Sequence, residues 1–430
     1  MAKILIVSVG GLDDLQPFLA AGTECAESGH EVTIATSAHL RDWVIFAGLR
    51  FARMAPDFES YGGYQRALEC RHDPQVWYRD VIVASLPEMI HDIREELVEA
   101  DVVITSSDAI GIGQWAQANG KTWISTNQDP AEFQSRFDPV VSLFSNPFLG
   151  SSPWVNFVIG GDRGVQQRAA EILAVQVRST IYAATNTMLP ENLLTEGRFS
   201  KTLHLCMCSP VIAESRSDWP TNVQFTGYLP FGPTRMAQKL EEWLLSGSKP
   251  LVFVSSEPSQ NFVMSSASIA RRLRRRGLVV AGAYAQECES VGDENIEIVD
   301  VTALDTAFAR SAGAVIHGGH AAFQALANGV SACISPRTAG EADTARRLEL
   351  IDLAGTYDGH FGSSGHLDAI TEWLEDEEYA YAARSYAGTC NPDFGAKLFA
   401  ASVQNAMSSP GVPKDEKMVQ IFDQQNRDAS

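Results

Sequence analysis

The sequence predicts an α/β protein made of two doubly wound domains. Its 430 residues exceed what one ordinary hydrophobic core accommodates and suit two domains of about 200 residues each. The first apolar run, residues 3–9, has the continuous hydrophobic character of a strand buried on both faces of a parallel sheet. A helix reaching Ser28 and a second strand over residues 31–35 follow, which completes a βαβ unit. A second apolar run of the same kind begins at Leu251, so the pattern recurs in the second half of the chain.

Residues 1–228 are expected to form the first domain. Its later strand signals occur at residues 48–51, 102–104, 122–125 and 219–229. Pro230 and Pro233 indicate a linker, expected over residues 229–248, with a short helix over residues 241–245.

Residues 249–390 are expected to form the second domain. Its strand signals occur at residues 251–255, 278–281, 296–299 and 314–316. A helix is expected over residues 391–408, and the polar residues 409–430 are expected to be a disordered tail.

The composition argues against several classes of partner. A net charge of −20 and a pI near 4.8 disfavour nucleic acid and anionic membranes. No apolar run reaches membrane-spanning length, and the first strand follows the N-terminus without a signal-peptide layout, so no integral membrane contact is expected. Seven cysteines, an odd number, suit free thiols in a reducing cytoplasm. Cys206 and Cys208 lack a second pair with which to hold zinc, so buried thiols are expected there.

The turn His317-Gly318-Gly319 is the strongest candidate for a binding site. It follows a strand signal and precedes a helix that begins near Ala321. The free N–H groups and the dipole of a helix N-terminus attract anions, and glycine lets a phosphate approach the backbone closely. His317 is also able to donate a hydrogen bond to a phosphate oxygen. The alternative is an ordinary turn between a strand and a helix.

The turn after the first strand carries two carboxylates. Gly10 and Gly11 lack the third glycine of a dinucleotide fingerprint. Asp13 and Asp14 follow at the carboxyl edge of the sheet, where open α/β sheets bind their ligands. They are candidates for acid–base chemistry, and the alternative is that they only cap the following helix.

A resemblance to a known family emerges from segments that follow one another in order. Residues 299–310, the His-Gly-Gly turn, residues 327–336 and residues 345–347 resemble the donor half of nucleotide-sugar glycosyltransferases of the GT-B fold, which has two Rossmann-like domains. The bacterial antibiotic (glycopeptide and macrolide) and sterol glycosyltransferases are the most similar branches. Asp14-Leu15-Gln16-Pro17 resembles the motif that opens the first helix in the antibiotic enzymes, so the resemblance covers most of the chain.

The resemblance implies a role for each candidate residue. Asp14 would be the general base, with Asp13 a weaker candidate for it. In this fold the last helix commonly crosses back to the N-terminal domain. The implied donor-binding residues are His317, Gly318, Gly319, His320, Ser255, Ser256, Val299, Val301, Glu341 and Asp343. The implied acceptor-binding residues are Gly11 together with aromatic residues of two irregular stretches, Tyr61, Tyr64, Trp77, Phe133 and Phe144, for which core packing is the alternative.

Two departures from the family pattern bear on the function. Small hydroxyl residues that usually follow the His-Gly-Gly turn are replaced here by His320, Ala321, Ala322 and Phe323. His320 either substitutes as a phosphate donor or packs behind the site. The family's Asp-Gln pair, which binds sugar hydroxyls, aligns with Gly340-Glu341, and Asp343 is a candidate replacement for the missing aspartate.

The implied activity is inverting transfer of a sugar from dTDP or UDP to a hydroxyl of a hydrophobic natural product. No metal and no other cofactor are expected, and the oligomeric state, monomer or homodimer, stays open. One alternative is a catalytically degenerate homologue that binds a ligand or a partner. Another is an epimerase or hydrolase of sugar nucleotides with the same fold, for which the sequence shows no added carboxylates.

Overall fold

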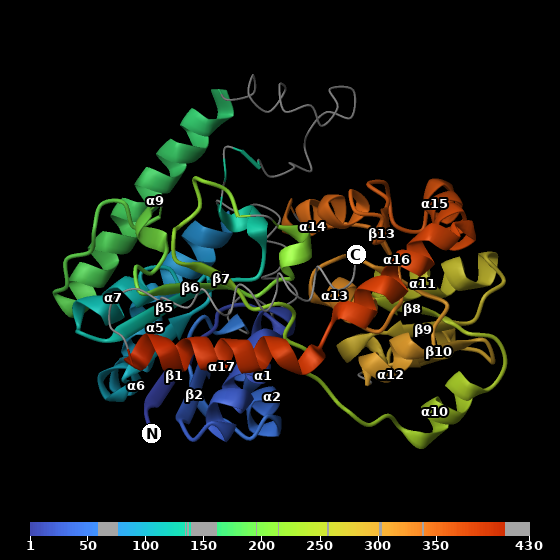
Figure 1. The fold of residues 1–430 in the computed structure, drawn as a ribbon, viewed down its shortest axis with the longest axis horizontal. Coiled ribbons are helices and arrows are strands. Elements are labelled where there is room, and N and C mark those ends of the chain that lie inside the picture. Colours follow the sequence, from blue (N-terminus) through green and yellow to red (C-terminus); the bar gives the residue numbers. More distant parts are fainter. Residues whose placement is uncertain are drawn as a thin grey trace. The chain divides into compact units, whose positions relative to one another are not determined.

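The computed structural model describes residues 1–58, 76–133, 135, 137–138, 161–194, 196–213, 215–255, 258–300, 303–337 and 339–408. These residues form two compact units (Figure 1). The first contains the chain up to Leu229 together with the last helix, and the second contains the chain from Pro230 to Pro392. Both are α/β units with parallel sheets, so the predicted fold class is confirmed.

The first unit is built on a seven-stranded parallel sheet of order β3-β2-β1-β4-β5-β6-β7. The strands are β1 Lys3–Val7, β2 Glu31–Thr36, β3 Arg50–Arg53, β4 Val102–Thr105, β5 Thr122–Asn127, β6 Leu203–Cys206 and β7 Val223–Phe225. The helices are α1 Leu12–Glu27, α2 Arg41–Phe46, the π-helix η4 Trp77–Val83, α5 Ala84–Asp92, α6 Arg94–Glu99, α7 Ile112–Ala118, α9 Gly161–Thr185 and α17 Pro392–Ser408.

The second unit repeats the same winding in a six-stranded sheet of order β10-β9-β8-β11-β12-β13. The strands are β8 Leu251–Val254, β9 Gly277–Val280, β10 Ile296–Val299, β11 Gly313–Ile316, β12 Ala332–Ile334 and β13 Ala354–Thr356. The helices are α10 Gln238–Leu245, α11 Gln260–Arg272, α12 Leu304–Ala309, α13 His320–Ala327, α14 Ala339–Glu349, α15 Ser364–Glu375 and α16 Glu377–Thr389.

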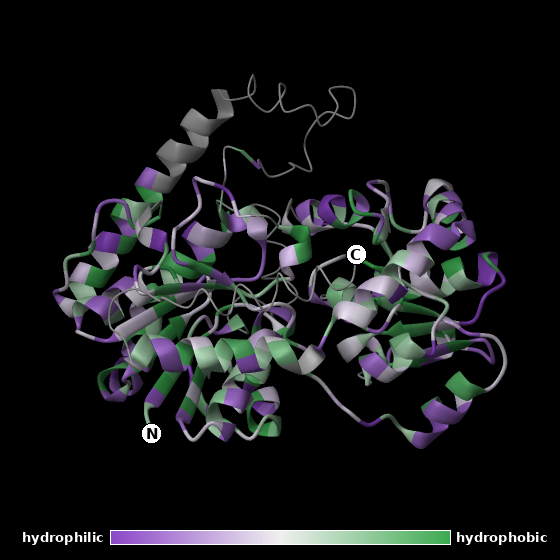
Figure 2. Ribbon diagram, viewed as in Figure 1, coloured by the Kyte–Doolittle hydropathy of each residue, from purple (hydrophilic) through white to green (hydrophobic). Residues whose placement is uncertain are grey.

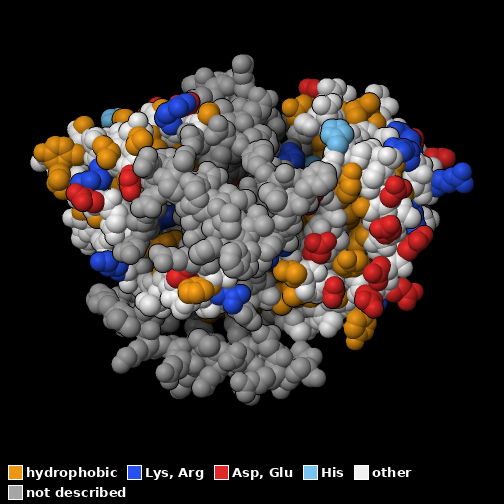
Figure 3. Space-filling model, turned by 90° about the horizontal axis from the view of Figure 1, so that it is seen from above, with side chains coloured by type: hydrophobic (Ala, Val, Ile, Leu, Met, Phe, Trp, Pro, Cys, Tyr) orange, Lys and Arg blue, Asp and Glu red, His pale blue; other side chains and the backbone are white. Residues whose placement is uncertain are grey.

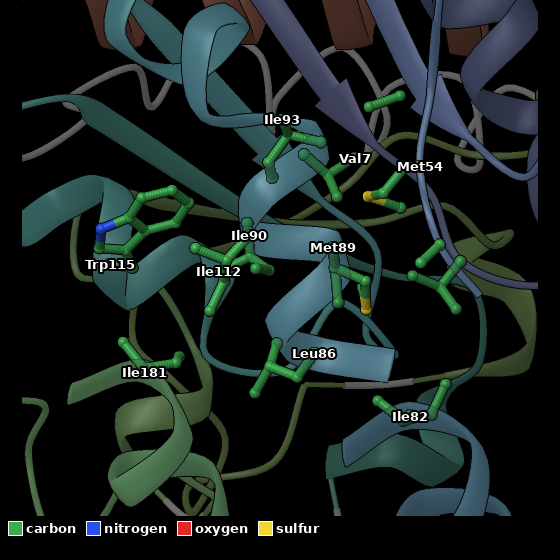
Figure 4. Close-up of a cluster of buried hydrophobic side chains, with 14 of the residues drawn as sticks. Val7, Met54, Ile82, Leu86, Met89, Ile90, Ile93, Ile112, Trp115 and Ile181 are labelled. Carbon is green, nitrogen blue, oxygen red and sulfur yellow. The ribbon is translucent and has the colours of Figure 1, made fainter. Parts of the chain in front are cut away.

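Continuous apolar strands and amphipathic helices explain both sheets. The central strands β1, β4, β8 and β11 are buried almost throughout, as parallel strands covered on both faces require. Figure 2 shows the hydropathy of the residues along the chain. In the first unit, Met89 and Ile90 of α5 meet Ile112 of α7 and Ile181 of α9 in one hydrophobic cluster (Figure 4). Gly111, with φ +80°, permits this approach, because a Cβ there would lie 2.5 Å from Cδ1 of Ile181.

Helix α17 belongs to the first unit although it ends the described chain. Gly395 lies so close to the Tyr228 carbonyl that a Cβ would be 2.3 Å from its oxygen. Further along the helix, Gln404 Oε1 contacts His30 Nε2 at 2.8 Å. The negative charge expected from the composition is visible as Asp and Glu side chains over the face of the second unit in Figure 3.

Candidate functional site

In the second unit, the strand order places the predicted donor residues at one edge of the sheet. Strands β8 and β11 are neighbours, and Ile316 pairs in register with Val254. Ser255 and His317, the next residue of each strand, therefore leave the sheet side by side at its carboxyl end. This is the point where the strand order reverses, which is where open α/β sheets bind ligands.

The turn at Gly318 and Gly319 is shaped as an open cradle. Gly318 and Gly319 have φ values of +132° and +66°, which favour glycine. A Cβ at Gly318 would lie 3.0 Å from Cβ of Glu341, whereas one at Gly319 would meet no heavy atom within 4 Å. Gly319 is the N-cap of α13, so the free N–H groups of that helix begin where the backbone is uncovered. The geometry suits an anion.

His317 is held as a neutral ring behind this turn. It is buried, with rings of Phe262 and Phe361 at centroid distances of 5.2 and 4.9 Å, and its Nδ1 lies 2.7 Å from the Ser335 carbonyl oxygen. Burial, helped by the positive charge of Arg337, lowers the pKa of His317 to about 3. A carbonyl only accepts, so the single proton of the neutral ring is on Nδ1 and Nε2 carries a lone pair. Donation from Nε2 to a phosphate oxygen therefore requires a second proton, which sequence reasoning did not anticipate.

Helix α14 brings one predicted sugar ligand to the turn and buries the other. Glu341 lies against Gly318, and its Oε2 accepts the backbone N–H of Arg337 at 2.7 Å. Asp343 points into the protein with a fully buried carboxylate, 2.6 Å from Nε of Arg347. That Asp343 binds the donor stays a prediction, and its buried carboxylate, paired with the Arg347 guanidinium, disfavours it.

The remaining donor candidates flank the same turn or fall outside the described residues. His320 is the first residue of α13 and is half-buried. Val299 ends β10, and its carbonyl accepts the N–H of Ala281 at 2.7 Å. Ser256 and Val301 lie outside the part of the chain that the structure describes.

In the first unit, Asp14 stands at the start of α1, after the central strand β1. Its Oδ2 accepts the N–H of Gly11, the N-cap residue, at 2.8 Å. A Cβ on Gly10 would lie 2.1 Å from this oxygen, so the carboxylate lies directly over the glycine turn. Asp14 thus caps the helix, as the alternative held. Asp13 is half-buried in the same helical turn.

The described aromatic candidates for acceptor binding are core residues. Trp77 is 3% exposed, stacks on Phe58 with a centroid distance of 6.3 Å, and donates from Nε1 to Asp108. Phe133 is buried and stacks on Trp219 at 4.3 Å. For these two residues the burial favours the core-packing alternative, and acceptor binding stays a prediction. Tyr61, Tyr64 and Phe144 lie outside the described residues.

Sequence reasoning missed a polar cluster at the carboxyl ends of β4 and β5. Asp108 accepts from the hydroxyl of Tyr78 at 2.9 Å as well as from Trp77. Nearby, Glu132 pairs with Arg198 at 2.5 Å, and burial nevertheless raises the pKa of the Glu132 carboxyl. Both side chains of this pair line a cavity of about 20 Å³, enough for one water. The signal was available in the sequence, because Ser106-Ser107-Asp108 directly follows an apolar strand.

Comparison with proteins of known function gives sequence relatives of one enzyme class. No family model matches the chain. A sterol 3-beta-glucosyltransferase from Arabidopsis thaliana is 23% identical over 347 residues, covering 74% of this chain and 51% of the relative. O-mycaminosyltylonolide 6-deoxyallosyltransferase from Streptomyces fradiae is 26% identical over 308 residues, covering 65% and 68%. The chain thus spans about half the length of the plant relative.

Solved structures share the fold over nearly the whole chain. The calicheamicin glycosyltransferase CalG4 has a TM-score of 0.67 and 16% identity, covering 95% of this chain and 98% of its own. The glycosyltransferase VinC, solved in complex with dTDP, has a TM-score of 0.63 and 16% identity, covering 95% and 100%. Every helix in the described residues is too short or too polar to cross a lipid bilayer. The likeness to CalG4 and VinC shows that the chain has the GT-B fold, and its relatives in sequence are sterol and macrolide glycosyltransferases.

Proposed function

We propose that this protein is an inverting, metal-independent glycosyltransferase. It would move a sugar from UDP or dTDP to a hydroxyl of a hydrophobic small molecule in the cytoplasm. The observation that carries the proposal is the glycine turn at residues 317–319, which stands at the sheet's switch point, opens at Gly319 and begins a helix. The sterol and macrolide enzymes among its relatives support both the reaction and the apolar class of acceptor.

The turn would stabilise the departing diphosphate. Negative charge develops on the phosphate oxygens as the bond to the sugar breaks, and N–H groups already fixed at a helix N-terminus stabilise it without reorganising. Glu341, beside Gly318, offers a carboxylate oxygen to a sugar hydroxyl. Binding of this kind uses the backbone and needs no metal.

Asp14 would remove the proton from the acceptor hydroxyl. Its carboxylate is positioned by the Gly11 N–H. Gln128, the residue after β5, holds the start of α1, because its Nε2 donates to the Asp14 carbonyl at 2.9 Å. The cap contact sets the position of this carboxylate at the carboxyl edge of β1, and it would act as the general base once the acceptor hydroxyl lies within hydrogen-bond reach. Direct displacement at the anomeric carbon would then invert its configuration.

A second candidate function is ligand binding without turnover. The residues after the turn favour it, because Ala322 and Phe323 are buried apolar side chains where small hydroxyl residues would contact phosphate. A protein that kept the cradle and lost transfer would bind nucleotide and show no activity with any acceptor.

Calorimetric titration with UDP and dTDP, in EDTA, tests the donor cradle. We expect micromolar binding of one of them without metal. Release of nucleoside diphosphate from a sugar nucleotide, measured with sterol and macrolide aglycones as acceptors, then separates the two candidates. Absence of nucleotide binding refutes the donor site, and binding that appears only with Mg²⁺ refutes metal independence.

The variant Asp14→Asn tests the base. Asparagine keeps an oxygen for the Gly11 N–H, so we expect a change in the free energy of unfolding within about 0.5 kcal/mol. Transfer should fall by at least about 100-fold, the usual contribution of a general base, while nucleotide affinity stays unchanged. Asp13→Asn is the matched control in the same turn. Transfer near the original rate in Asp14→Asn contradicts the assignment.

A further inference from the structure

A chain of buried polar groups stands behind the His317 turn in the second unit. Nδ1 of His317 donates to the carbonyl of Ser335, the residue that directly follows β12. The hydroxyl of Ser335 in turn contacts Nε2 of His366 at 2.8 Å. His366, in the first turn of α15, is fully buried. Two histidines distant in sequence are thereby joined through the two oxygens of one serine.

The hydrogen-bond partners determine the tautomer of His366. The backbone N–H of Gly362 donates to His366 Nδ1 at 3.1 Å, so Nδ1 is the acceptor nitrogen. Burial lowers the pKa of His366 to about 4, so the ring carries one proton at neutral pH, and that proton is on Nε2. Nε2–H therefore donates to the Ser335 hydroxyl.

Aromatic packing restricts both imidazole rings. The Phe361 ring lies between them, with centroids 4.9 Å from His317 and 4.8 Å from His366. Tyr357 stacks on His366 at 4.9 Å with an interplanar angle of 18°, and its hydroxyl contacts Ser363 Oγ at 2.7 Å. These contacts restrict the motion of both rings, because side chains in a closely packed interior have few alternative positions.

Ser335 connects His366 to His317, because its hydroxyl contacts one ring and its carbonyl the other. Its N–H is paired with the Ile316 carbonyl at 2.8 Å, and its carbonyl belongs to the bond with Pro336, which has no N–H. Because Ser335 lies beyond the end of β12, contacts of its side chain as well as of its backbone determine where its carbonyl points. His366 supplies that side-chain contact.

We infer that His366 is a positioning residue for the donor cradle: through Ser335 it holds the carbonyl that keeps His317 in its Nδ1–H tautomer and leaves Nε2 as the nitrogen offered to a ligand. The inference about the tautomer stands on the hydrogen bonds alone. The role in ligand binding rests on the proposed function. Without this support His317 would exchange its two tautomers, and only part of the population would keep Nδ1–H on the Ser335 carbonyl, the arrangement in which Nε2 takes up a second proton and donates it to a phosphate oxygen.

Three variants distinguish positioning from packing. His366→Leu fills the volume and removes both polar atoms, Ser335→Ala removes only the hydroxyl, and His366→Gln places an amide N–H near the position of Nε2. Circular dichroism and thermal unfolding establish that each is folded. A merely structural role predicts that His366→Gln and His366→Leu behave alike.

The first measurement is long-range ¹H–¹⁵N NMR of the ligand-free protein with ¹⁵N-labelled histidine. The chain has nine histidines, and the signals of His317 are identified by their loss in His317→Gln. We expect one protonated Nδ1 and one unprotonated Nε2 in the original protein and in His366→Gln. His366→Leu and Ser335→Ala should show averaged signals of two tautomers. An unchanged His317 pattern in His366→Leu overturns the inference.

The second measurement is a double-mutant cycle on UDP or dTDP affinity, using His366→Leu and His317→Ala. Loss of a hydrogen bond that orients one ligand group should weaken binding about fivefold in His366→Leu and hardly at all in His366→Gln. In the His317→Ala background the effect of His366→Leu should vanish. If it persists undiminished, His366 acts on the fold rather than on His317, and the inference fails. If the original protein binds neither nucleotide, the proposed function fails, while the NMR result still decides the tautomer.

Discussion

The substitution Gly319→Ala separates the donor cradle from the stability of the second unit. Gly319 has φ +66° and ψ −146°, a region that is almost restricted to glycine, so an alanine there is strained by about 1–3 kcal/mol. Its methyl group meets no protein atom within 4 Å, so the cost to the free protein is strain alone. In the proposed complex, the same space is where phosphate oxygens approach the backbone.

The expected loss of affinity follows from the contacts that the methyl group would block. A hydrogen bond to a charged group contributes about 1.5–3 kcal/mol, so losing even one weakens binding by roughly ten- to a hundredfold. The strain lowers the Tm of the unit by roughly 2–4 °C per kcal/mol. Calorimetry with UDP and dTDP gives the affinity, and scanning calorimetry gives the stability.

Gly329→Ala is the matched control at the other end of the same helix. Gly329 follows α13 with φ +73°, and a Cβ there would make only ordinary contacts, 3.6 Å from Cγ of Arg384. Alanine in this left-handed conformation costs about 1–2 kcal/mol, similar to the strain at Gly319. We expect Gly329→Ala to lower the Tm and leave nucleotide affinity unchanged. Equal affinities in Gly319→Ala and the original protein refute the cradle.

Three further predictions test individual side chains. Asp343→Ala should lower the free energy of unfolding by about 3–5 kcal/mol, since it removes the buried carboxylate that pairs with the Arg347 guanidinium. Glu341→Gln should instead raise the donor KM with little effect on the Tm, and the reverse pattern would favour Asp343 over Glu341 as the sugar ligand. Nucleotide binding should take up about one proton near pH 7, because His317 is neutral in the free protein down to about pH 3. Calorimetry in buffers of different ionisation enthalpy measures this uptake. If His317→Gln takes up the same proton on binding, the proton goes to another group. Burial lowers the pKa of His204, in β6, from the ordinary value near 6.5 to about 3. Its contribution to stability is therefore complete above pH 6.5 and is lost as the pH falls toward 3. Between pH 6.5 and 4 the Tm of His204→Gln should decline less steeply than the Tm of the original protein, and an equal decline would contradict the assignment.

The sequence predicted the local elements well where one strong pattern decided them. The apolar runs that became β1, β8 and β11 are continuous because a strand covered on both faces needs hydrophobic side chains at every position. The glycines at 318 and 319 indicated a tight turn, and the structure has one, with positive φ at both residues. Each of these signals lies within a few consecutive residues, so no knowledge of the rest of the chain was required.

The candidate site was predicted only in part, because burial is a property of the whole fold. Asp343 and Glu341 are two residues apart on one helix, yet one is sealed against Arg347 and the other lies beside Gly318. A helix turns by about 100° per residue, so two neighbouring acidic residues face in different directions, and only the packing of α14 says which faces the turn. The burial of Trp77 and Phe133 was likewise not predictable, since an aromatic residue in an irregular stretch suits a core and a ligand pocket equally well.

By itself, then, the sequence determined the class of fold, the position of the glycine turn and the carboxylates that open the first helix. The tertiary structure decided which nitrogen of His317 carries the proton, since Ser335 and His366 come from segments 18 and 49 residues away along the chain (335 − 317 and 366 − 317). It also decided that Asp14 caps α1 and that the carboxylate of Asp343 is buried against Arg347. The division has a physical cause: backbone conformation responds to neighbouring residues, whereas protonation and exposure respond to whatever the folded chain brings alongside.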